Sequence, residues 1–116
     1  MQLPSTFDNL ISKATEHDLY TKLIEQLNKD LALANIDLSF EGDVLPSSLK
    51  YLLHDTIYDL IQTKFINYLN LLYIIDVPEE KVKQLDNHAP LELADKVTFL
   101  ILRREWQKVW FKSHYS

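Results

Sequence analysis

A run of apolar and polar residues without glycine or proline dominates the middle of the chain. It extends over 29 residues, from Leu49 to Val77, and 18 of them are apolar. Polar side chains recur along the run at helical spacing and leave a broad apolar arc. The pattern predicts one long helix of about 43 Å, started by Pro46 and Ser47 with Ser47 as N-cap. We expect it to be the central helix. Its apolar arc is wider than a single neighbouring helix would cover.

Two apolar stripes that are out of phase with each other cover the first third of the chain. Capping-box spacings, from Ser5 to Asp8 and from Thr15 to Asp18, precede the two stripes. The pattern predicts a short helix and then a longer one that ends at about Asn35, and a single helix with a shifted face is the alternative. The stripes consist of Phe7, Leu10, Ile11 and Ala14, and then of Leu19, Leu23, Ile24, Leu27, Leu31 and Ala34.

An alternating segment follows, in which Ile36, Leu38 and Phe40 are separated by single polar residues. This period is typical of extended backbone, and Glu41, Gly42 and Asp43 then supply a turn. Since no second alternating run exists to pair with it, we predict that residues 36–45 form a strap across the long helix. Pairing of this segment with a strand of another chain is the alternative.

Two further helix starts are marked by proline and acidic residues. Asp76, Pro78, Glu79 and Glu80 favour a short helix with Val82 and Leu85 on its apolar face. Pro90 opens the last helix, which carries two apolar seams and therefore needs two neighbours. The seams are Leu93, Val97, Leu100 and Ile101, and Phe99, Leu102, Trp106, Val109 and Trp110.

Composition agrees with a helical chain. With 116 residues, 47% of them hydrophobic, and a single glycine, the chain fits one domain of helices joined by few loops. We predict an all-α bundle of four to five helices over residues 1–116.

The absence of cysteine excludes disulfides, thiolate metal sites and a cysteine nucleophile. No secretory signal or membrane span is indicated, so we expect a cytoplasmic protein.

Few residues fit a catalytic pattern. One glycine is too few for a phosphate-binding loop or a nucleophile elbow, and no Glu-x-x-His pair occurs that would place metal ligands one helical turn apart. His54, Asp55 and Asp59 border the polar stripe of the long helix, where solvated surface groups are the simpler interpretation. We therefore expect no enzyme, no metal and no cofactor. A small metal-dependent or ligand-binding protein built on these three residues is one alternative.

Four tyrosines lie on the long helix, and each offers an apolar ring with a polar tip. They could line a ligand pocket, although edges of the core, where the hydroxyl reaches water, are the simpler interpretation. The tyrosines are Tyr51, Tyr58, Tyr68 and Tyr73.

Basic and aromatic residues interleave near the C-terminus. This arrangement suits single-stranded nucleic acid, on which aromatic rings stack bases and cations neutralise phosphates. The net charge of -5 argues against it, and core packing or a protein interface explains the same residues. The cluster contains Arg103, Arg104, Trp106, Lys108, Trp110, Phe111, Lys112, His114 and Tyr115.

Around Leu71–Val77 and Thr98–Lys108, the sequence resembles a family of short uncharacterised proteins of Bacteroidetes-type bacteria. The similarity extends over about residues 19–112, and the tract from Arg103 to Lys108 is its most distinctive part. The resemblance implies a bacterial, cytoplasmic setting, and the family has no assigned function to carry over.

The patterns together favour a non-catalytic protein-interaction module. We predict a homodimer, or the binding of a partner helix, through apolar surface on the long helix or around the two tryptophans. Arg103, Arg104, Trp106, Lys108, Trp110, Phe111 and Tyr115 are the candidate interaction residues. A nucleic-acid accessory protein that uses Arg103, Arg104, Lys108 and Lys112 is the second hypothesis.

Overall fold

The computed structural model describes residues 2–115. This range contains six helices, joined by loops, and no strand. The predicted all-α class is therefore confirmed, with one helix more than expected. The helices are α1 (Phe7–Glu16), α2 (Tyr20–Leu33), α3 (Pro46–Thr63), α4 (Phe65–Ile75), α5 (Glu79–Lys83) and α6 (Pro90–Tyr115).

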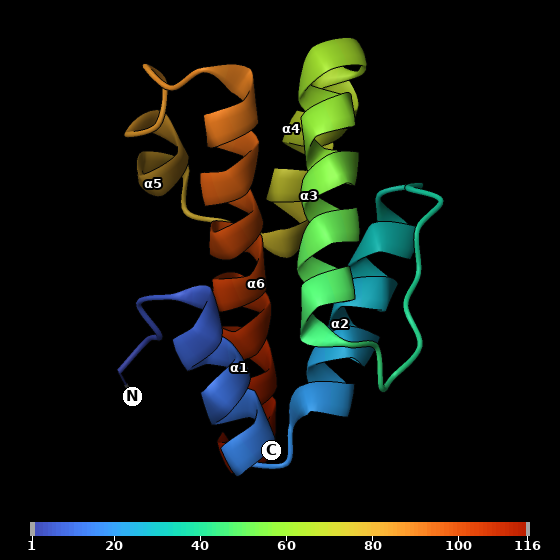
Figure 1. Cartoon of the computed structure of the whole chain (residues 1–116), viewed down its shortest axis with the longest axis vertical. Helices are drawn as coiled ribbons and strands as arrows, with labels where there is room; N and C mark the ends of the chain where they lie inside the picture. Colours follow the sequence, from blue (N-terminus) through green and yellow to red (C-terminus); the bar gives the residue numbers. More distant parts are fainter. Residues whose placement is uncertain (1, 116) are drawn as a thin grey trace.

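The central helix is α6, and not the run between Leu49 and Val77. It has 26 residues, lies beside α3, and contacts α1, α2 and α4 as well (Figure 1). Its two apolar seams account for this position, because Val97 and Ile101 from one seam and Leu102 and Trp106 from the other are all buried. The predicted need for more than one neighbour is thus confirmed.

The long apolar run is broken at Lys64, which corrects the prediction of one continuous helix. Lys64 has φ -142° and ψ 59°, ends α3 and begins α4. The break lets the chain turn, so that Leu53 and Ile57 of α3 and Leu71 and Ile75 of α4 are all buried in one core. A straight helix would carry its second half away from that core. No glycine or proline marks the site, because the gain in burial comes from tertiary contacts.

Three helices end at an Asp or Asn with positive φ, where other proteins commonly have glycine. Asp18, Asn35 and Asp76 have φ of 57°, 59° and 67°. After Asp76, the N–H of Val77 donates to the carbonyl of Leu72 at 3.0 Å, which is the long hydrogen bond of a Schellman turn. Short polar side chains tolerate this conformation best after glycine, so a chain with one glycine can still end its helices sharply.

Three predicted helix starts are shifted. Thr15 lies within α1, and the N-cap of α2 is Leu19. Thr6 caps α1 in place of Ser5, and its Oγ1 accepts from the N–H of Asn9 at 3.1 Å. Leu45 is the N-cap of α3 in place of Ser47, because Pro46 already occupies the first helical position, where its fixed φ suits a helix and no N–H is needed. The starts near Glu79 and at Pro90 are confirmed.

The strap of residues 36–45 is extended but unpaired with any strand, as predicted, and it lies along α2 and not across α3 (Figure 1). Asn28 holds its middle: the side-chain amide donates to the carbonyl of Phe40 at 2.8 Å, and its oxygen accepts from the N–H of Phe40 at 2.9 Å. The strap passes so near α2 that a Cβ on Gly42 would lie 3.0 Å from Cγ2 of Thr21. The single glycine therefore serves a close approach.

We expect Asn28→Ala to lower the free energy of unfolding by about 1–3 kcal/mol, because it leaves the N–H and carbonyl of Phe40 without their partner in a part-buried place. Urea denaturation followed by circular dichroism measures this. Glu25→Ala, on an exposed position of the same helix, is the control and should change the free energy by less than about 0.5 kcal/mol. Equal effects of the two substitutions would contradict the role of Asn28.

Candidate functional site

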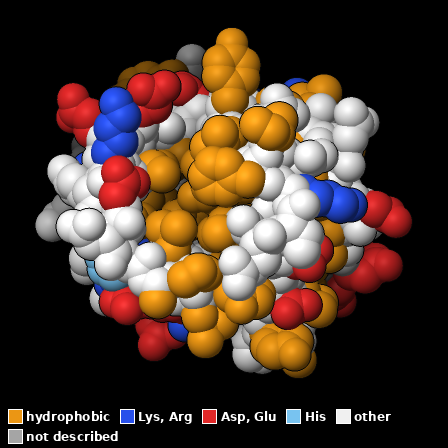
Figure 2. All heavy atoms as spheres, turned by 90° about the horizontal axis from the view of Figure 1, so that it is seen from above, with side chains coloured by type: hydrophobic (Ala, Val, Ile, Leu, Met, Phe, Trp, Pro, Cys, Tyr) orange, Lys and Arg blue, Asp and Glu red, His pale blue; other side chains and the backbone are white. Residues whose placement is uncertain are grey.

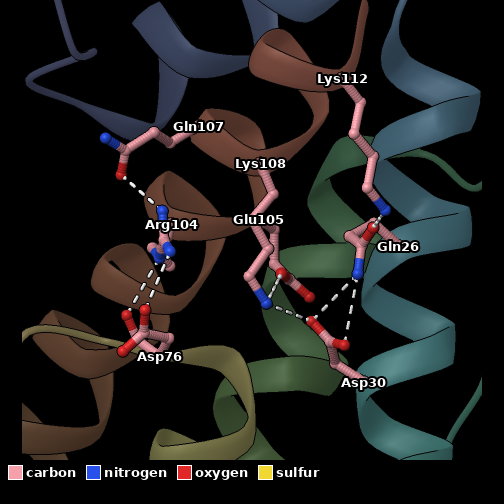
Figure 3. A network of polar contacts seen from close by, with 8 residues as sticks. All are labelled: Gln26, Asp30, Asp76, Arg104, Glu105, Gln107, Lys108 and Lys112. Atoms are coloured by element: carbon pink, nitrogen blue, oxygen red, sulfur yellow. Dashed lines mark hydrogen bonds and ion pairs between the residues drawn. The ribbon is translucent and has the colours of Figure 1, made fainter. Parts of the chain in front are cut away.

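The predicted interaction residues near the C-terminus differ in their surroundings, and one of them is buried. Trp106 is only 1% exposed and lies in the core, so it is corrected from interaction residue to core residue. Arg104 is bound to the junction after α4: its Nη2 lies 3.0 Å from Oδ2 of Asp76, and its Nε donates to the carbonyl of Asp76 at 3.0 Å. Its Nη1 donates to Oε1 of Gln107 at 3.0 Å (Figure 3). Arg103 lies over the ring of Phe99.

The remaining aromatic residues of that cluster pack on one another at the end of α6. Trp110 is half-buried and stacks on His114, with 3.9 Å between ring centroids. Phe111 and Tyr115 are exposed and stack on each other at 5.4 Å. These rings therefore already stack on one another within the chain.

A polar network joins α2 to α6 and takes up the other cations (Figure 3). Lys108 Nζ lies 2.8 Å from Oδ2 of Asp30 and 3.3 Å from Oε1 of Glu105. Gln26 donates to both oxygens of Asp30, at 3.3 and 3.4 Å, and accepts from Lys112 at 2.6 Å. Of the four cations in the nucleic-acid hypothesis, Arg104, Lys108 and Lys112 thus have partners within the chain, and less of their charge is offered to phosphates.

Glu105 is the unusual member of this network, since it has no exposed surface. Burial and the neighbouring carboxylate of Asp30 raise its pKa to about 9, against the opposing effect of Lys108. Burial also opposes ionisation of Asp30, but the neighbouring Glu105 and the hydrogen bond and positive charge of Lys108 outweigh it and lower the pKa of Asp30. At neutral pH the pair therefore holds one proton, on Glu105.

Glu105 has no exposed surface, and the network joins α2 to α6 through contacts of Asp30 and Gln26 with Lys108 and Lys112. Sequence reasoning missed it because Asp30 and Glu105 are far apart along the chain. A signal existed, however: Ile101 and Val109, four residues before and after Glu105, are both buried, and positions four apart share a helix face. A charged residue between such neighbours is a candidate for a buried polar group.

The residues considered for metal or ligand chemistry all lie on α3. His54 Nε2 lies 3.3 Å from the carbonyl oxygen of Leu91, and Asp55 and Asp59 are exposed. Within residues 2–115, no group of three or more His, Asp or Glu side chains is placed to hold a metal ion. Nor is any helix in this range long and apolar enough to cross a membrane.

The four tyrosines have different surroundings. Tyr51 and Tyr73 are exposed, Tyr58 is half-buried and accepts from Gln62, and Tyr68 is buried. Burial raises the pKa of Tyr68 to about 12, with a further contribution from the negative charge of Asp86. Its hydroxyl has no hydrogen-bond partner in the described part of the chain.

Helix α4 has more exposed large apolar side chains than any other helix within residues 2–115. Four of its eleven residues are large apolar side chains that face solvent, and we call them the α4 ridge. They are Phe65 (51% exposed), Ile66 (76%), Leu69 (44%) and Tyr73 (83%). Their spacings of one, three and four residues place them on one side of the helix, opposite the buried Leu71 and Ile75. Seen from the end where α3 passes into α4, hydrophobic side chains gather in a broad patch with charged groups around it (Figure 2).

A groove adjoins the α4 ridge, between α4 and the segment that contains α5. Its volume is about 610 Å³. Its apolar lining includes Tyr68 and Leu72 of α4, Val82 of α5 and Leu93 at the start of α6, and the ridge residues Phe65, Leu69 and Tyr73 form one wall of it. Its charged lining residues are Asp76, Glu79, Lys83 and Asp86. We call it the α4–α5 groove. Ridge and groove together form one apolar surface of alternating relief, which is typical of interaction sites.

Local sequence accounts for this surface only in part. Residues 65–75 are apolar at nine of eleven positions, so any packing of α4 on one side leaves apolar side chains on the other. The sequence predicted such an excess on the long run, but the break at Lys64 decides that it falls on α4.

No known family, no curated protein and no solved structure matches this chain, and the resemblance drawn from its sequence stays a prediction.

Proposed function

We propose that the chain is a non-catalytic protein-interaction module that docks through the α4 ridge and the α4–α5 groove. The exposure of four large apolar side chains on one short helix carries this proposal. At about 25 cal/mol per Å² of apolar area, leaving such side chains in water forgoes about 1.5–3 kcal/mol for each one that a partner would fully bury. Soluble monomers seldom expose contiguous apolar patches beyond a few hundred Å².

The shape of the surface favours a protein partner with a helical or extended apolar segment. Side chains of a helix form ridges that fit the grooves of another helix, and here a ridge and a groove lie next to each other on α4. Aromatic residues are enriched at the centres of protein interfaces, and the ridge contains Phe65 and Tyr73. This use involves no bound group and no reaction.

Photo-crosslinking tests the proposal in the cells that make the protein. A benzoylphenylalanine at position 73 is expected to form crosslinks to protein, because Tyr73 lies on the ridge. The same group at position 51 is the matched control, since Tyr51 is also a highly exposed helical tyrosine, at 69%, but lies on α3. Absence of adducts from position 73, or equal yields from both positions, would overturn the proposal.

A further inference from the structure

We infer that the partner at this site is a second copy of the same chain, with its α4 antiparallel to the first across a twofold axis. Each ridge would then lie in the other copy's groove, and Lys64 of each copy would face Glu79 of the partner subunit. This inference rests on the proposed function, because it names the partner that the same surface binds.

The shape of the surface supports a second copy of the chain as the partner. A twofold interface must be complementary to itself, since the same patch is present on both sides. An apolar projection with an apolar groove beside it meets this requirement when one copy is rotated by 180°. Ile66, which is 76% exposed, forms the projection. Leu69 and Tyr73 form the wall that the ridge shares with the groove, and Leu72 and Val82 line the recess behind that wall.

The charges at the two ends of α4 select the antiparallel arrangement. Lys64 precedes the first residue of α4, whereas Asp76 follows the last and Glu79 begins α5. Antiparallel helices bring the basic end of each copy to the acidic end of the other. Parallel helices would place Lys64 against Lys64 and the carboxylates against one another, which costs energy at short range.

Glu79 is the carboxylate that remains open for this contact. Asp76 is already bound to Arg104, whereas neither Lys64 nor Glu79 has an ion-pair partner within residues 2–115. Both are exposed. An exposed ion pair adds little energy by itself, but in a twofold assembly it occurs twice and fixes the orientation of the two copies.

The oligomeric state tests the partner. Since α4 and α5 are short, we expect an interface at the small end of the known range and a dissociation constant on the order of micromolar. Sedimentation equilibrium from about 5 to 500 µM should therefore show a mass that rises from 13.7 kDa toward the dimer value. Ile66→Asp should keep the chain at monomer mass. Leu33→Asp, at an exposed leucine of α2 (60%), is the control and should leave the association unchanged.

Charge reversal tests the orientation. Lys64→Glu and Glu79→Lys should each raise the dissociation constant about tenfold, because two attractive pairs become repulsive. The double variant restores both pairs and should return to within about threefold of the original chain. Glu80→Lys, next to Glu79 on α5 and also exposed, controls for net charge. Circular dichroism and urea midpoints confirm that each variant is folded.

Each outcome decides one claim. A chain that stays at monomer mass to the highest concentration overturns the second copy as partner, while crosslinks from position 73 would still support the proposed function with a different protein. A dimer that single reversals leave unchanged, or that the double variant fails to restore, overturns the antiparallel arrangement alone.

Discussion

Trp106→Ala is expected to lower the free energy of unfolding by about 3–5 kcal/mol, the range for truncating a large buried aromatic side chain. Trp106 is the largest fully buried side chain of the described chain, and it lies on α6, which contacts four other helices. The cavity left behind would therefore disturb packing on several sides. Such a loss is a large part of the stability of a small domain.

Urea denaturation measures this loss, and Trp110→Ala is the matched control one turn further along α6. Trp110 is only half-buried, and so we expect it to cost about half as much or less. Trp106→Phe should cost less than Trp106→Ala, because it keeps an aromatic ring and removes an indole N–H that is buried without a partner in the described structure. If Trp106→Ala were no more costly than Trp110→Ala, the central place of Trp106 in the core would be wrong.

Glu105→Gln is expected to stabilise the protein, by about 3 kcal/mol at pH 7. The folded chain keeps the proton of Glu105 because its pKa is raised to about 9, whereas the unfolded chain releases it near the ordinary value of 4.5. Release favours unfolding at every pH above 4.5. Glutamine has nearly the same shape, cannot ionise, and can still donate to Asp30 and accept from Lys108.

The pH dependence gives this prediction its sign. With Glu105 present, its contribution to stability is complete below about pH 4.5, falls as the pH rises to about 9, and changes little beyond it. Asp30 acts in the opposite sense: since its pKa is lowered from 3.8, its contribution is present above that pH and is lost as the solution becomes more acidic. Urea midpoints at pH 5, 7 and 9 should fall for the original chain and vary less for Glu105→Gln. If Glu105→Gln were less stable and its urea midpoint depended on pH as steeply as that of the original chain, Glu105 would be ionised in the folded protein.

Much of the fold could be predicted from local patterns. Apolar spacing identified α1, α2 and α6, and proline identified the starts of α5 and α6. The lack of a second alternating segment showed that residues 36–45 are a strap. These features depend on neighbours within a few residues, which the chain order displays directly.

The candidate site was only partly predictable. The excess of apolar residues between Leu49 and Val77 indicated uncovered surface. The interaction residues, however, were predicted in the cluster of basic and aromatic residues around Trp106. In the structure, Trp106 is in the core, and Arg104 and Lys108 bind Asp76 and Asp30. The spacing of residues shows that basic and aromatic side chains lie on the same helix. It does not show which residues of other helices they contact.

The sequence by itself determined the helical class, the approximate position of most helices and the presence of more apolar surface than one chain buries easily. Only the tertiary structure decided that the long run breaks at Lys64, that α6 is central, and that four large apolar side chains of α4 stay exposed. Periodicity is a property of neighbouring residues, and it sets which side chains share a face. Which face is covered depends on the burial of distant elements against each other, and that energy can overcome a local helical preference where no glycine or proline is present.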